Sequence, residues 1–120
     1  MCLCDLFAHA RYIVASFLSP NGARGVFPCF DEPAFKANYS ITLVHPAGYR
    51  ALSNMPALKQ EARGPGWNAT RFQTTPKMST YLVAFVVCDF VRESRTVDNT
   101  VVSALQLTSL HTMCLMHVEK

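Results

Sequence analysis

The sequence carries little charge of either sign. Charged residues make up 16% of the 120 residues and hydrophobic residues 50%, and the formal net charge is +3. The basic residues are scattered and nowhere form a run of three. Because nucleic-acid-binding domains concentrate Lys and Arg on one face, this composition argues against a nucleic-acid partner. It is typical of one small globular domain and too apolar for a disordered segment.

Long hydrophobic runs are also missing. The longest apolar stretch, Tyr81–Cys88, is far shorter than the ~20 residues of a membrane helix. Met1–Ala10 contains Asp5 and His9 and lacks a basic start followed by an unbroken apolar stretch. We therefore predict neither a transmembrane segment nor a targeting segment, and the sequence assigns no compartment.

Five cysteines are present, an odd number that does not suit a complete disulfide framework. Cys2 and Cys4 are too close for the C-x2-C pair of a zinc ribbon, and the sequence has no second closely spaced cysteine pair to complete such a site. We predict free thiols, mostly buried, including Cys29 and Cys88.

Short β-forming segments separated by turn residues run along the chain. In Lys36–His45, Tyr39, Ile41 and Leu43 alternate with polar residues, as in a half-buried strand. Arg63-Gly64-Pro65-Gly66 is the strongest turn and predicts a hairpin. Strands are predicted at 11–18, 36–45, 49–52, 58–61, 67–75, 80–90 and 91–102. The tail 103–120 is expected to be a short helix or a frayed strand.

The predicted fold is all-β, with antiparallel sheets packed as a sandwich. Tyr81–Val87 is apolar on both faces, which favours a central strand covered on each side; a buried helix is the alternative. Trp67 is expected in the core beside it.

One segment is far from generic. Residues 23–37 read A-R-G-V-F-P-C-F-D-E-P-A-F-K-A, and this resembles the A-R-x-x-F-P-C-F-D-E-P-A-x-K-A signature of zinc aminopeptidases of the aminopeptidase N type. The similarity continues, in the family's order, through 41–43, 51–56 and 74–85. It covers Tyr12 to Val102 and is highly specific, because several separate motifs agree.

The resemblance implies a partial N-terminal β-domain, part of a saddle-shaped cap over a thermolysin-like catalytic domain. It divides the chain into a non-family leader (1–10), an aminopeptidase N-like portion (11–102) and a non-family tail (103–120). Members of the family are mostly plasma-membrane ectoenzymes with an extracellular β-domain, and they remove N-terminal residues from peptides.

The chemistry of such a peptidase is not encoded here. The family's zinc site uses H-E-x-x-H on a helix plus a later glutamate, and its exopeptidase motif is G-A-M-E-N. The histidines are His9, His45, His111 and His117, and none stands four residues from another. We predict no catalytic residue, no metal ligand and no cofactor in this chain, although the full-length family uses zinc.

Within the signature, we assign structural roles to Arg24, Phe27, Pro28, Cys29, Asp31, Glu32 and Pro33. Asp31 and Glu32 are flanked by prolines, so a turn is favoured over catalysis. Arg24 is expected to pair with one of them and close the loop. The family's substrate-contacting Gln or Glu falls at Ser19, which is shorter and uncharged.

Two glycosylation sequons begin at Asn38 and Asn68. The resemblance places a family sequon at Asn68 and another two residues after Asn38. A shift of two residues keeps a side chain on the same face of a strand, so an outward face is expected there.

Three hypotheses for the chain follow. It is a non-catalytic scaffold, partnered by the catalytic domain of an aminopeptidase. Alternatively, it is a binding module that joins a full-length homologue by strand addition at an open edge. In the third, it is an unstable truncated product with exposed edges.

Overall fold

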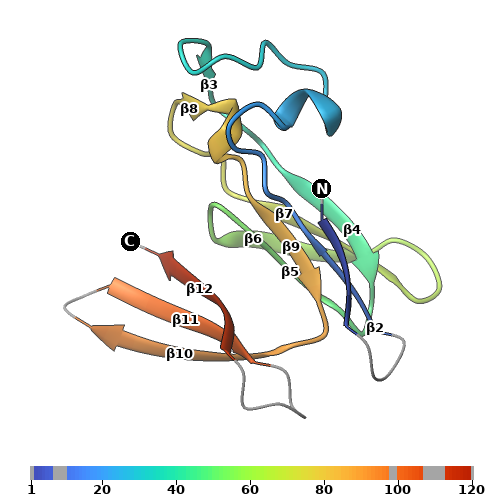
Figure 1. The fold of residues 1–120 in the computed structure, drawn as a ribbon. Helices are drawn as coiled ribbons and strands as arrows, with labels where there is room; N and C mark the ends of the chain where they lie inside the picture. Colours follow the sequence, from blue (N-terminus) through green and yellow to red (C-terminus); the bar gives the residue numbers. More distant parts are fainter. Residues whose placement is uncertain (1, 7–10, 98–99, 107–112, 120) are drawn as a thin grey trace. The chain divides into compact units, whose positions relative to one another are not determined.

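Antiparallel strands supply nearly all the regular structure, in agreement with the all-β prediction. The computed structural model describes residues 2–6, 11–97, 100–106 and 113–119 (Figure 1). The chain forms two compact units, Met1–Cys88 and Asp89–Lys120. The described helical segments are single 3-10 turns, and none has the length and apolar character needed to cross a membrane.

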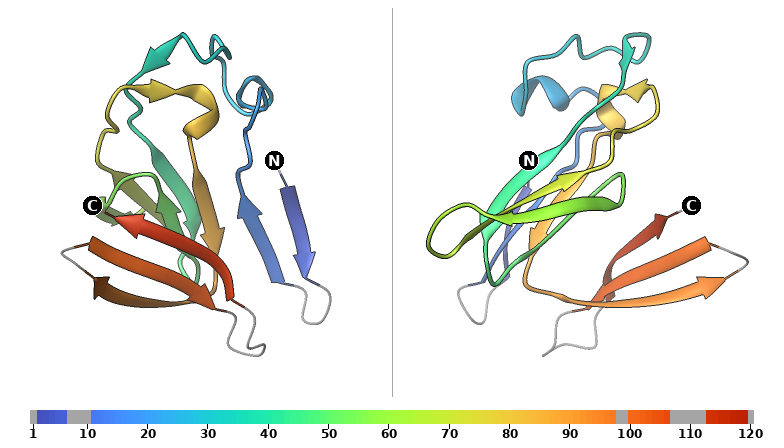
Figure 2. Two further views of the ribbon diagram at one scale, coloured as in Figure 1. Left: turned by 60° about the vertical axis from the view of Figure 1, so that its left-hand side comes forward. Right: turned by 180° about the vertical axis from the view of Figure 1, so that it is seen from behind.

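Three sheets build the first unit. The four-stranded sheet has the order β1 (Cys2–Leu6), β2 (Arg11–Ala15), β9 (Phe85–Cys88) and β5 (Arg50–Ser53). The three-stranded sheet has the order β4 (Thr42–Pro46), β7 (Trp67–Phe72) and β6 (Ala57–Ala62). A two-stranded ribbon joins β3 (Lys36–Ala37) to β8 (Met78–Ser79). Figure 2 shows the three-stranded sheet lying across the larger one, as expected of two packed layers.

The second unit is a single meander of β10 (Val91–Val97), β11 (Thr100–Gln106) and β12 (Met113–Glu119). Its β12 shows that the helix alternative for the tail was wrong over these residues. Residues 107–112 lie outside the described part of the chain.

The clearest core cluster lies below the signature loop. Leu18, Ala23 and Val83 are almost fully buried there, and Phe27, Tyr39, Ile41 and Met78 are among the apolar side chains packed against them. Ala23 begins η1 (Ala23–Gly25), the 3-10 turn that opens the signature. The loop is therefore tucked onto the core although its prolines exclude regular structure.

Several predicted strands are shorter than expected or divided: 11–18 ends at Ala15, 67–75 ends at Phe72, and 91–102 contains β10 and the start of β11. The predicted strand 80–90 starts instead at Phe85, because Thr80–Leu82 forms the 3-10 turn η2. β9 is central between β2 and β5, but Phe85, Val86 and Val87 are only half-buried, so burial on both faces was wrong. The predicted strand 36–45 is divided into β3 and β4, yet Tyr39, Ile41 and Leu43 still share the more buried face.

Trp67 is not a core residue: 49% of it is exposed. Strand alternation explains this result, since Thr70 and Phe72 are buried and Asn68 is half-buried on the opposite face of β7. That inner face also contacts His45 of β4, whose Nε2 lies 2.9 Å from the Thr70 hydroxyl. Trp67 instead shares the outer face with Arg71.

The predicted hairpin joins β6 to β7. Gly64 and Gly66 have φ angles of 114° and 76°, a region in which a Cβ is strained. On the other side of β6, no described strand pairs with it. Its pairing with β7 shifts register between Ala57 and Lys59, as at a bulge.

We expect Gly66→Ala to lower the free energy of unfolding by about 1 kcal/mol, because alanine must adopt a positive φ there. Thermal unfolding followed by circular dichroism measures the change. Gly48→Ala is the matched control, since its added Cβ meets no atom within 4 Å and its φ is not positive. Equal midpoints for the two variants would refute a strained turn.

Candidate functional site

The carboxylate of Asp31 lies at the centre of the signature loop. Its Oδ2 accepts hydrogen bonds from the Arg24 backbone amide at 3.1 Å and from Arg24 Nε at 3.3 Å. Its Oδ1 accepts the Thr80 hydroxyl at 2.6 Å, and Arg24 Nη2 donates to the Asp31 carbonyl at 3.0 Å. The Asp31 side chain is 1% exposed and that of Arg24 60% exposed. We call this group of three residues the Asp31 clamp.

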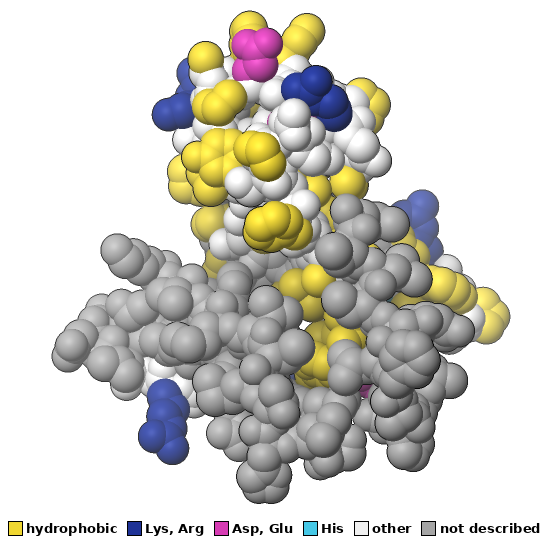
Figure 3. All heavy atoms as spheres, in the orientation of Figure 1, with side chains coloured by type: hydrophobic (Ala, Val, Ile, Leu, Met, Phe, Trp, Pro, Cys, Tyr) yellow, Lys and Arg dark blue, Asp and Glu magenta, His cyan; other side chains and the backbone are white. Residues whose placement is uncertain are grey.

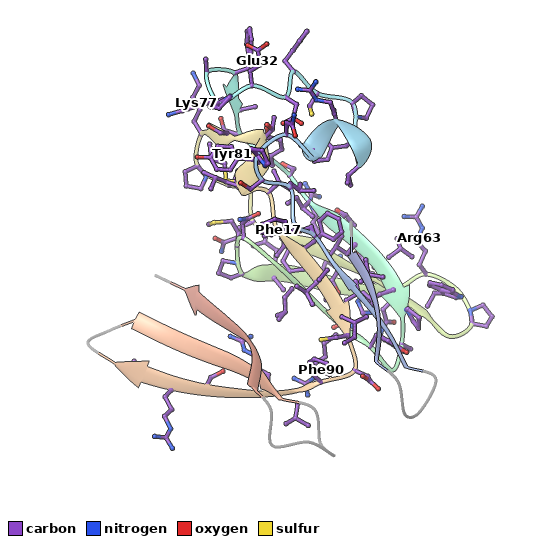
Figure 4. All side chains as sticks on the ribbon, in the orientation of Figure 1. Phe17, Glu32, Arg63, Lys77, Tyr81 and Phe90 are labelled. Carbon is purple, nitrogen blue, oxygen red and sulfur yellow. The ribbon has the colours of Figure 1, made fainter. Side chains whose placement is uncertain are left out.

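The clamp favours the ionised form of the carboxyl group. The hydrogen bond from the Thr80 hydroxyl is the main cause that lowers the pKa of Asp31 below its ordinary value. Burial acts in the opposite direction, and the hydrogen bonds and charge of Arg24 lower the pKa further. The expected Arg24 ion pair is thus present and uses Asp31. Glu32, the other candidate, is exposed and points to the outside of the loop (Figure 4).

The clamp brings together two segments of the family signature that are far apart in sequence. Thr80 follows Asp31 by 49 residues, and Ser79 Oγ donates to the Pro33 carbonyl at 2.8 Å. Lys36 pairs with Ser79 in the short ribbon. The F-P-C-F-D-E-P loop is therefore held against the K-M-S-T-Y segment at several points.

A third signature segment joins the same place. Asn54 Nδ2 donates to the Leu82 carbonyl at 2.8 Å, while its Oδ1 accepts the Ala84 amide at 2.8 Å. Ser53 Oγ donates to the Ala84 carbonyl at 2.8 Å. These side chains cap the backbone between η2 and β9, where strand pairing is absent. The polar signature residues thus stabilise this backbone by hydrogen bonds.

The apolar signature residues border an open cleft of about 480 Å³. Phe27, Phe30, Phe35 and Tyr39 supply aromatic surface, with Cys29 between them and Lys36 as the charged residue. The Phe30 and Phe35 rings are 5.5 Å apart, and those of Phe27 and Tyr39 are 6.1 Å apart and edge-on. Phe30 is 79% and Phe35 54% exposed. Hydrophobic side chains gather on this end of the unit in Figure 3.

The other predicted site residues are dispersed. Ser19 is exposed in the turn before η1. Cys29 is half-buried and Cys88 is buried. The pKa of Cys29 is raised, mainly by burial. Asn38 is exposed, with Nδ2 donating to the Thr75 carbonyl at 2.8 Å. Asn68 is half-buried in β7.

Sequence reasoning missed the roles of the buried residues Thr80 and His45 and of the half-buried Asn54. His45 is 1% exposed, with Nδ1 3.0 Å from the Pro46 carbonyl and Nε2 close to Thr70. The alternation of residues 39, 41, 43 and 45 was the available signal that His45 faces inward. No sequence signal pairs Asp31 with Thr80, because the contact is long-range.

The described residues do not fit a zinc ion. Within residues 2–6, 11–97, 100–106 and 113–119, no three His, Cys, Asp or Glu residues are placed to share a metal. Both nitrogens of His45 already face hydrogen-bonding partners, and Asp31 is engaged by Arg24 and Thr80. We therefore derive no reaction step through a metal.

The contacts around Asp31 join three segments of the signature that are far apart in sequence. Comparison of the sequence with known families assigns these segments to one domain. Residues 8–82 match the Peptidase M1 N-terminal domain, and the chain belongs to this family. The resemblance to the aminopeptidase N type is confirmed.

Individual relatives agree with this assignment. The chain is 57% identical over 90 residues to aminopeptidase Q of Mus musculus, across 72% of this chain and 16% of that protein. It is 51% identical over 86 residues to human aminopeptidase N, across 68% of this chain and 9% of that protein. For glutamyl aminopeptidase of Sus scrofa, the identity is 50% over 86 residues. The chain thus spans a small fraction of the relatives that it matches.

We expect Asp31→Asn to remove a pH-dependent contribution to stability. The folded pKa of Asp31 is lowered from 3.8, so its stabilisation is complete above that pH and is lost as pH falls toward the folded pKa. The melting midpoint of the variant should lie roughly 5 °C below wild type at pH 7, and the gap should narrow below about pH 4. Circular dichroism melts between pH 7 and pH 2 measure this gap.

Glu32→Gln is the matched control, because it removes the neighbouring carboxyl group from an exposed position outside the clamp. Its midpoint at pH 7 should stay within about 1 °C of wild type. A gap between Asp31→Asn and wild type that is constant from pH 7 to pH 2 would contradict the assigned role.

Proposed function

We propose that this chain is a non-catalytic part of the N-terminal domain of an aminopeptidase N-like zinc metallopeptidase. Aminopeptidases of this type are generally zinc-dependent and act on peptides. The observation that carries the proposal is the use of the signature residues. The polar side chains of the signature form hydrogen bonds that hold the loop and its supporting backbone, as seen for Asp31, Thr80 and Asn54.

The absence of the zinc motif from the sequence supports a scaffold role. Peptide hydrolysis by a zinc enzyme needs converging ligands and a base beside the metal-bound water. The sequence has neither H-E-x-x-H nor G-A-M-E-N. In this proposal the chain contributes residues 11–102 as the family-like portion, while Ser19 makes little or no contact with substrate.

The aromatic cleft supports contact with the catalytic domain of an aminopeptidase. Phe30 and Phe35 expose more than half of their surface at the rim of one cleft. Contiguous exposed aromatic surface of this kind marks an interface with another protein surface. Because these residues belong to the clamped loop, they are held in place before any partner arrives, which lowers the entropic cost of association.

The sequons extend the proposal to the secretory pathway. Asn38 is exposed, and its Nδ2 retains a second hydrogen beyond the one donated to Thr75. Attachment of a glycan at this nitrogen is thus compatible with the hydrogen bond. Asn68 is less accessible because its strand face is turned inward.

We expect the purified chain to release no amino acid from an alanyl-peptide substrate, with or without added zinc. The physical reason is the missing ligand set. Human aminopeptidase N is the positive control in the same assay. Chelator-sensitive release by the chain, at a rate above that of a buffer blank, would overturn the non-catalytic assignment.

We also expect the chain to bind an aminopeptidase catalytic domain prepared without its own N-terminal domain. The double substitution Phe30→Ser and Phe35→Ser should weaken this binding roughly tenfold or more, because aromatic anchors dominate interface energies. Leu58→Ser is the matched control, since Leu58 is a 60% exposed apolar residue on β6. Equal losses for the double variant and for Leu58→Ser, or no binding at micromolar concentration, would contradict the proposal.

A further inference from the structure

A second concave surface lies on the outer face of the three-stranded sheet. It has a volume of about 360 Å³ and is lined mainly by Thr42, Lys59, Glu61, Arg63 and Arg71. The strand register places Thr42 and Lys59 on either side of Arg71, so one row of polar side chains crosses all three strands. We call these five residues the sheet-face site.

The charges of the sheet-face site are unbalanced. Lys59 forms an ion pair with Glu61 on the same strand. The pKa of Glu61 is lowered, first by the hydrogen bond from Lys59 and to the smallest extent by the charge of Arg71. The strand register places Arg71 opposite Lys59. Among the described residues, neither Arg63 nor Arg71 has a carboxylate within salt-bridge distance. Two guanidinium groups therefore remain available to an anion.

An aromatic ring stands beside these cations. Trp67, Ala69 and Arg71 alternate along the outer face of β7, and Ala69 and Arg71 both line the site. The Arg63 amide donates to the Trp67 carbonyl at 2.9 Å, so Arg63 and Trp67 are neighbours across the hairpin. Half of Trp67 is exposed. Its ring offers a flat apolar surface beside Arg63, on the strand face that also carries Arg71.

We propose that the sheet-face site binds an anionic polysaccharide that carries sulfate groups and free hydroxyls. The sulfates match the planar donor forks of Arg63 and Arg71. The hydroxyls supply hydrogen-bond donors for the Glu61 carboxylate, and the apolar face of a sugar ring covers Trp67. An acidic peptide also matches the arginines, and its backbone amides can donate to Glu61, but its acidic side chains present no flat apolar face to Trp67.

The full 120-residue chain is titrated with a heparin decasaccharide by calorimetry at about 0.15 M salt, where weak long-range attraction is screened. We expect Arg63→Ala and Arg71→Ala each to weaken binding roughly fivefold or more, and Trp67→Ala roughly threefold. Arg71→Gln repeats the test with a side chain that is shorter and uncharged but keeps hydrogen-bond donors. Unchanged circular dichroism spectra show that the variants are folded.

Lys77→Ala is the matched control, because it removes one exposed positive charge from a loop distant from Arg63 (Figure 4). Its affinity should stay within about twofold of wild type, and polyglutamate should bind roughly tenfold more weakly than heparin. If Lys77→Ala lost as much affinity for heparin as the arginine variants, the net charge of the chain alone would explain binding, and the proposed site would be wrong. Polyglutamate binding as tightly as heparin would overturn the carbohydrate assignment in favour of an acidic protein partner.

Discussion

The buried carboxylate of Asp31 is the contact on which the signature loop depends. A carboxylate removed from water is costly unless its oxygens are fully hydrogen-bonded, and here a hydroxyl, a backbone amide and a guanidinium supply those bonds. The exposed Arg24 side chain alone would add little, since surface ion pairs are weak. The buried Thr80 contact gives the clamp its strength and ties the loop to a segment 49 residues away.

This arrangement gives the polar residues of the sequence signature a structural role. The loop cannot pair as a strand because of its prolines, and the backbone between η2 and β9 also leaves the sheet. Side chains therefore satisfy the polar groups that strands would otherwise satisfy. Asp31, Ser79 and Asn54 each hydrogen-bond to a specific backbone or side-chain partner.

Sequence patterns correctly predicted the features that depend on neighbouring residues, namely strand faces and turns. The alternation at Tyr39, Ile41 and Leu43 gave the correct buried face, and the glycines around Pro65 gave the hairpin. The Arg24–Asp31 pair could be predicted because the two residues are only seven positions apart in the sequence. Trp67 was misplaced because hydrophobicity was weighed above strand parity, although Thr70 and Phe72 define the inner face of β7. The partners of Asp31 and Asn54 depend on tertiary placement, which periodicity does not encode.

The side of β6 with which no described strand pairs has a consequence for self-association. An unpaired strand edge is a template on which another chain can add, and repeated addition builds fibrils. β6 carries Lys59 and Glu61 and shifts register before them, so a second strand cannot continue a regular ladder along it. The same irregular edge that leaves the charged row of this strand open to solvent also makes it a poor seed for polymer growth.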